Sequence, residues 1–276
     1  MSRPLTCWLV VAVALAPMTV LAFDPKNIEL KDPSGDDKGP GSYTYPTQSA
    51  YKKGSFDLLG LTLKDKGSTI EIITRVGAKI EDPWNSKSWG GNGFSLQMVQ
   101  LYINNKKGGM RNALPGINVK FAKGHAWDKV VFISPQPKAK ILSEVKSKKA
   151  KALSRIVIPV RTFARGREIV SVVNKSDLGG APTRDWGFQA VMQSNEGYSD
   201  KDSILARKVN EYNGEHRFGG GSDYNCDPHV IDMLAPPARG GGGEKDAQYK
   251  ALKSYKCDAS GKGTEAVIPM VYPGKL

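Results

Sequence analysis

Apolar and polar residues alternate along much of the chain with a period of two. In the segment 70–76, for example, Ile70 and Ile72 alternate with Glu71 and Arg75. Because successive side chains of a strand point to opposite faces, this pattern is typical of strands that bury one face. Six further segments are rich in β-forming residues: 55–63, 94–103, 127–133, 155–160, 168–174 and 186–193.

Turn-forming residues separate these segments, with clusters of Gly, Asn, Asp and Pro at 104–109, 134–137 and 177–182. One-sided strands at this spacing predict an all-β fold, an antiparallel two-sheet β-sandwich of the jelly-roll type with a few short helices. Helices are expected at 244–256 and, as a single turn, at 200–207. The strands do not alternate with helices, which argues against a dinucleotide-binding fold or an α/β barrel.

The first 22 residues are organised like a secretory signal peptide. Arg3 precedes the apolar run 8–16, and the sequence Val-Leu-Ala at 20–22 offers small residues for cleavage. The run is too short to span a bilayer, although an uncleaved anchor is the alternative interpretation. We therefore expect a signal peptide at 1–22 and a single β-sandwich domain at 23–276. The protein would be exported to the periplasm, the medium or the cell surface, with no later transmembrane segment.

The chain is strongly basic, with 40 Lys and Arg against 27 Asp and Glu and a net charge of +13. In an exported protein this charge favours polysaccharide or other anionic polymers of the cell envelope over nucleic acid. The segment 138–151 is the most basic, and its candidate contacts are Lys146, Lys148, Lys149 and Lys151. The alternative is a solvated β-hairpin whose lysines discourage edge-to-edge strand pairing.

Export also changes the interpretation of the three cysteines. Cys7 lies in the signal peptide, so Cys226 and Cys257 are the pair left in the mature chain, in a compartment that permits oxidation. We expect them to form a structural disulfide. Two free thiols or a catalytic pair are the alternatives, but the spacing is not C-x-x-C.

Common catalytic signatures are missing from the sequence. It has no H-E-x-x-H, no G-x-S-x-G, no Walker loop and no dinucleotide-binding glycine fingerprint. The histidines His125, His216 and His229 do not have metal-ligand spacing. A non-catalytic protein is therefore favoured over an enzyme.

The segment 32–46 (DPSGDDKGPGSYTYP) carries Asp32, Asp36 and Asp37 in a turn rich in Pro and Gly. Clustered carboxylates held by a tight turn are suited to Ca²⁺, which prefers hard oxygen ligands. The segment is not an EF-hand, because the twelfth position is Tyr43 instead of Glu. The alternative is a loop in which the carboxylates accept hydrogen bonds from backbone amides.

Several segments resemble the C-terminal module of glucodextranase. The most specific is the opening block at 32–46, and the others are the following: Phe56-Asp57-Leu58, SLQMVQLYI (95–103), RDWGFQAVMQSNEGYSD (184–200) and HRFGGGSDYNCDPHVIDMLAPP (216–237). The resemblance extends over about residues 24–273. That module is similar to the DOMON-like superfamily, which includes family 9 carbohydrate-binding modules. Glucodextranase activity is not expected, because the module stands without a catalytic domain.

The resemblance implies a β-sandwich that binds sugar, with a structural calcium ion in some relatives. It strengthens the assignment of calcium to the three aspartates of the opening block and adds Asp232 as a candidate ligand. Other relatives hold haem non-covalently for electron transfer. The candidate axial ligands here are the histidines and four methionines: Met98, Met110, Met192 and Met233.

Sugar binding requires aromatic faces beside hydrogen-bonding groups. Trp89 is the foremost candidate, because neighbouring glycines leave it exposed in a polar loop. The full candidate set is Trp84, Trp89, Tyr43, Tyr45, Asn85, Asn92 and Gln97. Trp127 and Trp186 begin apolar strands and are expected in the core, and packing at a strand end is the alternative for Trp84.

The sequence thus predicts an exported, non-catalytic module that binds carbohydrate and contains a structural calcium ion. Two alternatives remain open. One is a periplasmic electron-transfer protein with non-covalently bound haem, and the other is a structural component of a cell-surface assembly.

Overall fold

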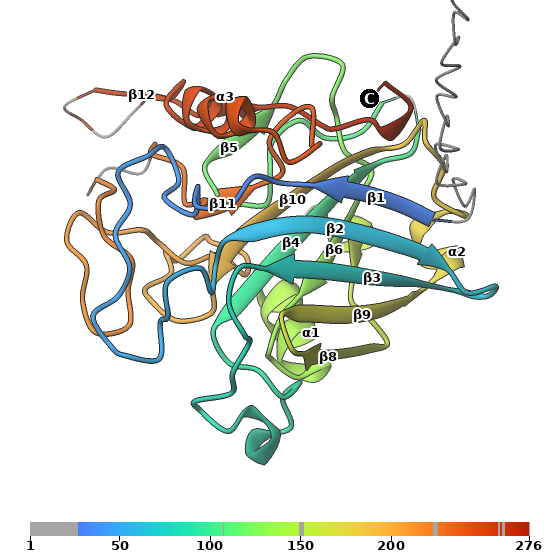
Figure 1. Cartoon of the computed structure of the whole chain (residues 1–276), viewed down its shortest axis with the longest axis horizontal. Coiled ribbons are helices and arrows are strands. Elements are labelled where there is room, and N and C mark those ends of the chain that lie inside the picture. The colour runs from blue at the N-terminus through green and yellow to red at the C-terminus, as the bar shows by residue number, and fades with distance from the viewer. Residues whose placement is uncertain are drawn as a thin grey trace, which may run out of the picture.

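The computed structural model describes residues 27–106, 108–148, 152–222, 226–258, 260 and 263–275. The expected signal peptide lies outside these ranges, as do Lys149 and Lys151 of the basic segment. The described residues form mainly β-structure in two large sheets, which confirms the all-β sandwich. Figure 1 shows the strands crossing the molecule, with helices and loops around them.

One sheet has neighbouring strands that are all antiparallel. Its strands, in order, are β1 (Asn27–Lys31), β2 (Leu58–Asp65), β3 (Thr69–Val76), β9 (Glu168–Asn174) and β8 (Arg161–Arg165). Its inner face is apolar, with Leu61 and Leu63 of β2 beside Ile70 and Ile72 of β3. The outer face carries polar residues such as Glu71, as the period of two predicts.

The second sheet contains the most deeply buried strands. Its order is β11 (Asp232–Met233), β10 (Gly187–Ser194), β4 (Gln97–Asn104), β6 (Lys129–Ile133) and β7 (Ile156–Val157). The pairs are antiparallel except for β6 and β7, which are parallel. Every residue of β10 is buried, so this sheet must be covered on both faces.

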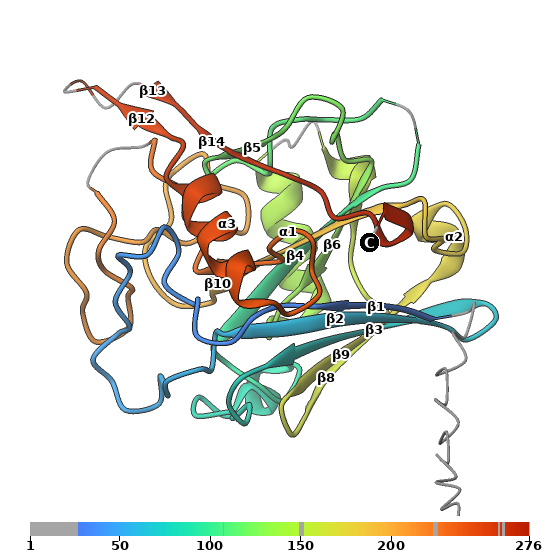
Figure 2. The same cartoon turned by 45° about the horizontal axis from the view of Figure 1, so that its top comes forward.

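The two faces of β4 contribute to two different hydrophobic cores. Val99 and Leu101 pack in the core shared with the first sheet. Met98 and Tyr102 point the other way, into a core that includes Ile141 and Leu252 of two helices. The second sheet is therefore the middle layer of the molecule, between the first sheet and a helical layer (Figure 2).

The remaining elements of the described residues are three helices, three 3₁₀ turns and two short sheets. The helices are α1 (Lys138–Ser147), α2 (Lys175–Leu178) and α3 (Gly242–Leu252), with 3₁₀ turns η1 (Ser86–Trp89), η2 (Leu153–Arg155) and η3 (Pro273–Lys275). The short sheets pair β5 (Val119–Phe121) with β14 (Ala266–Ile268), and β12 (Lys256–Cys257) with β13 (Gly263–Thr264). The expected helix at 244–256 is confirmed as α3, although it ends at Leu252 and Lys256 already belongs to β12.

The basic segment at 138–151 is not a β-hairpin, because residues 138–147 form α1. The helix begins after Pro137 and buries Ile141 and Val145, which are four residues apart. This spacing is helical, whereas a hairpin strand would bury every second residue. The single helical turn expected at 200–207 is also absent, since these described residues form turns and irregular structure.

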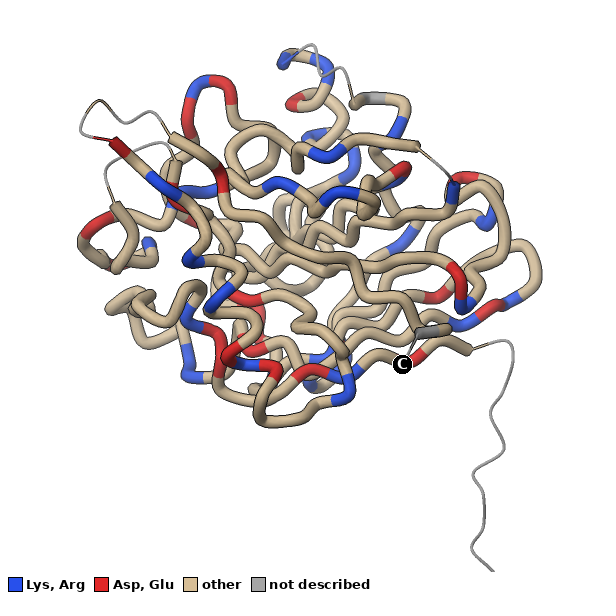
Figure 3. The backbone as a smooth tube through the Cα atoms, turned by 90° about the horizontal axis from the view of Figure 1, so that it is seen from above, with Lys and Arg blue, Asp and Glu red and all other residues tan. Residues whose placement is uncertain are grey.

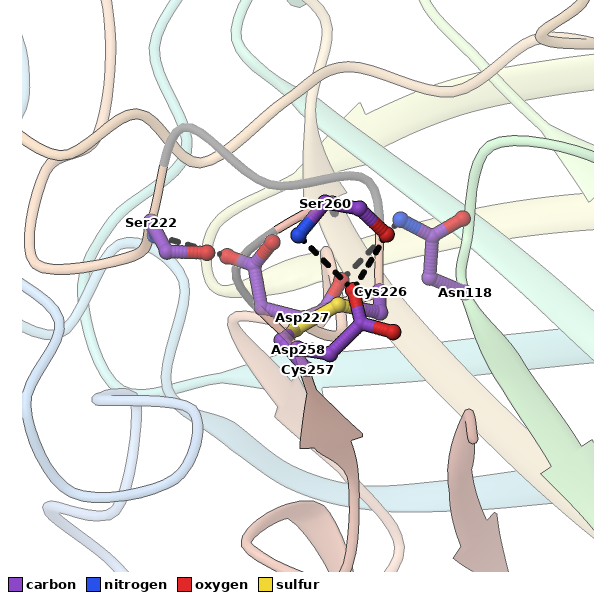
Figure 4. The surroundings of a disulfide bond; sticks show 7 residues. All are labelled: Asn118, Ser222, Cys226, Asp227, Cys257, Asp258 and Ser260. Atoms are coloured by element: carbon purple, nitrogen blue, oxygen red, sulfur yellow. Dashed lines mark hydrogen bonds between the residues drawn. A yellow bond between two sulfur atoms is a disulfide. The ribbon is translucent and has the colours of Figure 1, made fainter. Parts of the chain in front are cut away.

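The expected disulfide joins Cys226, in the loop before β11, to Cys257 of β12, with 5.7 Å between the two Cα atoms. Figure 4 shows its surroundings. Next to it, the side-chain amide of Asn118 donates a hydrogen bond to the carbonyl of Asp227 at 3.0 Å. The cross-link therefore fastens the outer β12–β13 hairpin to a loop that also contacts the β5 region.

Candidate functional site

Three carboxylates meet between the end of β1 and the start of β11. Asp32 follows β1, Asp36 lies in the turn after it, and Asp232 is the first residue of β11. One carboxylate oxygen from each lies within 4.8 Å of the others. All three side chains are buried, and Asp36 and Asp232 have no exposed surface.

The hydrogen bonds around this acidic cluster of Asp32, Asp36 and Asp232 are incomplete. Asp32 accepts one bond from the amide of Ala235 at 2.8 Å, and Asp232 accepts two, from the amides of Leu58 at 2.7 Å and Met233 at 2.8 Å. In contrast, Oδ2 of Asp32 and both carboxylate oxygens of Asp36 accept no hydrogen bond from the described residues. A buried carboxylate oxygen without a donor is costly, so these atoms need a proton or a cation.

The electrostatics of the cluster lead to the same requirement. Burial, together with the negative charge of Asp57, raises the pKa of Asp36 to about 7. Burial and the neighbouring carboxylates also hold the pKa values of Asp32 and Asp232 well above their usual range. Three buried carboxylates repel each other when all are ionised, and a divalent cation among them removes that repulsion. The donor set therefore fits a hard cation such as Ca²⁺.

Asp37, which was also a candidate ligand, is not part of this cluster. Its carboxylate accepts a hydrogen bond from the hydroxyl of Tyr45. Asp57, which was not among the predicted ligands, lies nearby and accepts hydrogen bonds from Ser34 and Gly35 at 3.0 and 2.8 Å. Its position in the Phe-Asp-Leu segment was the signal available in the sequence.

Helix α3 holds the turn that carries Asp36. Gln248 donates to the carbonyl of Asp36 at 2.6 Å and accepts from the amide of Met233 at 3.0 Å. Lys245 donates to the carbonyl of Gly35 at 2.7 Å. The two residues lie three positions apart on one face of the helix, which explains why a segment more than 200 residues away in sequence can fix this turn.

A second feature is a cavity of about 530 Å³ near η1. Its lining comes from loops and the start of α1, and consists of Trp84, Trp89, Gln136, Pro137, Lys140, Glu196 and His216. We refer to it as the tryptophan cavity. Trp89 is 39% exposed, and Trp84 is half-buried. Two indole rings beside amide, carboxylate, ammonium and imidazole groups form a mixed aromatic and polar surface.

Local hydrogen bonds explain why the two tryptophans lie together. The ring nitrogen of Trp89 donates to the carbonyl of Trp84 at 3.3 Å, across the η1 turn. Asp82 accepts from the amide and hydroxyl of Ser86, which starts that turn. His216 meets the ring of Trp84 edge-on, with centroids 5.3 Å apart.

Only some of the predicted sugar contacts belong to this cavity. Trp84 and Trp89 line it, while the exposed Asn85 precedes η1. Asn92 donates to the carbonyls of Ser134 and Gln136 at 2.8 and 3.2 Å, and so joins two loops of the cavity.

Tyr43, Tyr45 and Gln97 do not lie on this surface. Tyr43 and Gln97 are buried, and their polar groups bond to the carbonyls of Pro228 and Ser55. Tyr45 packs against the core and bonds to Asp37. The prediction that these three side chains contact a sugar is therefore not supported. The polar lining residues Gln136, Lys140, Glu196 and His216 were not predicted, because they come from separate segments of the sequence.

The candidate residues for haem and for polyanion binding are placed as follows. Met98, Met192 and Met233 are packed in the two cores, and Met110 is half-buried. Trp127 lies in a core as expected, and Trp186 is half-buried. Lys146 and Lys148 are exposed on or next to α1. Figure 3 shows Lys and Arg distributed over the whole molecule.

The protein is a β-sandwich module with a candidate ligand cavity on its surface. Comparison with protein families identifies which one. Residues 28–270 match the family described as the C-terminal, SLH-like binding module of glucodextranase, and the chain belongs to that family. No curated protein matched the chain. In the part of the chain that the structure describes, none of the helices is long and apolar enough to cross a membrane.

Proposed function

We propose that this protein is an exported, non-catalytic module that binds carbohydrate of an extracellular or cell-surface polymer in the tryptophan cavity. The observation that carries the proposal is the pairing of Trp84 and the exposed Trp89 in a cavity with polar groups on its walls. The C–H faces of a pyranose ring pack on indole rings, and its hydroxyls bond to side chains such as Gln136 and Glu196. Membership of a binding-module family supports the same function.

The test is binding of the mature protein to a glycan array, followed by titration of the best glycan. We expect Trp89→Ala to weaken binding by about tenfold or more, which corresponds to about 1.4 kcal/mol. Val160→Ala, which shortens an exposed apolar side chain outside the cavity, should leave the affinity unchanged. A folded wild-type protein that binds no glycan would overturn the proposal.

We further propose that the acidic cluster holds a structural Ca²⁺ ion. Asp32, Asp36 and Asp232 would be its ligands, and further oxygen atoms would complete the six to eight ligands that Ca²⁺ usually takes. The unpartnered buried oxygens of Asp32 and Asp36 support this assignment. When bound, the ion would link the turn after β1 to β11 and so stabilise the fold. Calorimetric titration of EDTA-treated protein with Ca²⁺ tests it directly, and a flat titration would contradict it.

The haem hypothesis has a separate test. The buried positions of Met98, Met192 and Met233 offer it no support, because haem ligation would displace packed core side chains. An absorption spectrum of the protein after incubation with haem decides the question. A Soret shift typical of axial ligation would favour electron transfer over sugar binding.

A further inference from the structure

A second and larger cleft lies at the other end of the middle sheet. It has a volume of about 1080 Å³ and is lined from the loops after β4, before β6 and before β10, and from the C-terminal segment. Its lining includes two aromatic residues, Trp186 and Tyr272, and three basic residues, Lys106, Arg111 and Arg184. Asp185 is the acidic residue among the described residues that line it. We refer to it as the basic cleft.

The two cavities are separated by the length of one strand. Strand β10 begins at Gly187, directly after Trp186 of the basic cleft, and ends at Ser194, two residues before Glu196 of the tryptophan cavity. Eight residues of extended strand span about 25 Å. Figure 1 agrees, with the η1 turn at the bottom of the view and the C-terminus at the upper right. The basic cleft is thus a site of its own.

The two aromatic side chains of the basic cleft pack against the rest of the protein, which fixes their positions. Trp186 is half-buried against the core of the sandwich. Tyr272 meets the ring of His125 edge-on, with centroids 5.5 Å apart, and His125 accepts a hydrogen bond from the amide of Met270 at 2.8 Å. Fixed aromatic rings with partly exposed surfaces are suited to packing against sugar rings, because little side-chain entropy is lost on binding.

The charged part of the cleft is suited to anions. Lys106, Arg111 and Arg184 are exposed, and neither Lys106 nor Arg111 forms an ion pair with a described residue. The guanidinium of Arg111 is oriented by a hydrogen bond from its Nε to the carbonyl of Phe121 at 2.9 Å. An oriented guanidinium is the preferred partner of carboxylate and phosphate groups.

The walls of the basic cleft leave room for a polymer. Glycines form part of them: Gly108, Gly109, Gly124 and Gly274. Gly109 has a positive φ, and a Cβ atom there would lie 2.5 Å from the carbonyl oxygen of Trp127, so this part of the wall requires glycine. The cleft volume slightly exceeds the usual range of about 300–1,000 Å³ for small-molecule pockets, which suits several linked sugar units better than one.

We propose that the basic cleft binds an anionic glycan, a chain of sugars that carry carboxylate or phosphate groups. The sugar rings pack on Trp186 and Tyr272 while the anionic groups pair with Lys106 and Arg111. This assignment goes beyond the proposed function and does not depend on the tryptophan cavity. The module then has two glycan sites of different charge preference at opposite ends of one sheet.

Binding of the mature protein to three polymers tests the proposal: a polyuronate, a phosphorylated mannan and neutral dextran. We expect the wild type to bind at least one of the two anionic polymers. The double variant K106Q/R111Q should weaken that binding by about tenfold or more. The control K53Q/K66Q removes the same charge from two exposed loop positions outside the basic cleft and the basic segment, and should change the affinity by less than about twofold.

The outcomes are distinct. Binding to the polyuronate alone identifies carboxylate as the anionic group, and binding to the mannan alone identifies phosphate. Equal losses in the two double variants would overturn the proposal, since they would indicate unspecific charge attraction, and so would a folded wild type that binds neither anionic polymer. Trp89→Ala should retain anionic-glycan binding, so a failure of the proposed function would be recognised separately. If the double variant does not fold, the single variant Lys106→Gln, at an exposed position, takes its place and should also weaken binding to the anionic polymer.

Discussion

Asp36 is the residue whose surroundings most restrict what the acidic cluster can be. It has no exposed surface, and both of its carboxylate oxygens are without hydrogen-bond donors among the described residues. Replacing it with Asn removes the charge but retains the shape. In EDTA at pH 8 we expect Asp36→Asn to be at least as stable as the wild type, because repulsion from Asp32 and Asp232 is relieved.

In the presence of Ca²⁺ the wild type should be more stable than Asp36→Asn. Calcium at about 100 times its Kd stabilises the wild type by about 2.7 kcal/mol, which is several degrees in Tm for a domain of this size. Asp36→Asn should lose most of this gain. Thermal unfolding with and without Ca²⁺ measures it, and Asp246→Asn, at an exposed position of α3, is the matched control. An unchanged calcium response in Asp36→Asn would contradict the assignment.

The raised pKa values also predict a pH dependence. The pKa of Asp36 is about 7 in the folded protein against 3.8 in the unfolded chain, so the folded state binds more protons between these values. Asp227, whose pKa burial raises to about 6, contributes in the same direction. Without metal, stability should therefore fall as the pH rises from about 4 to 7. The stabilisation by Ca²⁺ should grow over the same pH range. Chemical unfolding at pH 5 and pH 8 measures both trends, and a metal-free protein that is more stable at pH 8 than at pH 5 would contradict the prediction.

The candidate site could be predicted from sequence only where its residues are close together in the chain. Asp32 and Asp36 lie in one turn, and Trp84 and Trp89 in one loop, so composition and spacing were sufficient. Tyr43 follows the same acidic turn, yet its hydroxyl reaches the carbonyl of Pro228, a partner 185 residues away that no local pattern reveals. Lys140 and His216 were missed for the same reason, since only the fold brings them to Trp84.

Among the elements, the strands could be predicted from the sequence, whereas helix α1 was not predicted. Strands such as β3 bury alternate residues, and this period is visible in the sequence. In α1 the lysines dominate the composition, whereas the structural signal is limited to Ile141 and Val145. The parallel pairing of β6 with β7 was also outside the sequence prediction, because strand direction depends on the connection through α1.

The β12–β13 hairpin leads to a prediction about the disulfide. Cys226 and Cys257 are 31 residues apart, and a cross-link of this span stabilises by roughly 3–4 kcal/mol in the chain-entropy description. The double variant Cys226→Ser and Cys257→Ser should lower the free energy of unfolding by an amount of that order. Urea unfolding measures it, with reduced wild-type protein as the comparison. A loss below about 1 kcal/mol would show that the two segments are held together without the bond.

On the scale of the whole molecule, the middle sheet connects two sites. Both β4 and β10 extend from the tryptophan cavity to the basic cleft, and they pair along their whole length from Gln97 and Ser194 to Asn104 and Gly187. If both sites bind glycan, a single copy should retain a labelled neutral glycan on a surface coated with anionic glycan. Trp89→Ala and K106Q/R111Q should each abolish this retention. Retention that survives both changes would exclude bridging through these two sites.

The antiparallel pairing of β4 and β10 has a mechanical consequence for such a bridge. When one polymer pulls on each end, the tension runs along the strands, and backbone hydrogen bonds of an antiparallel ladder lie across that direction. The pull therefore loads the whole ladder at once in shear, instead of opening it one bond at a time. We expect the module to yield at a higher force when stretched between its two sites than when the same sheet is peeled from its β7 edge.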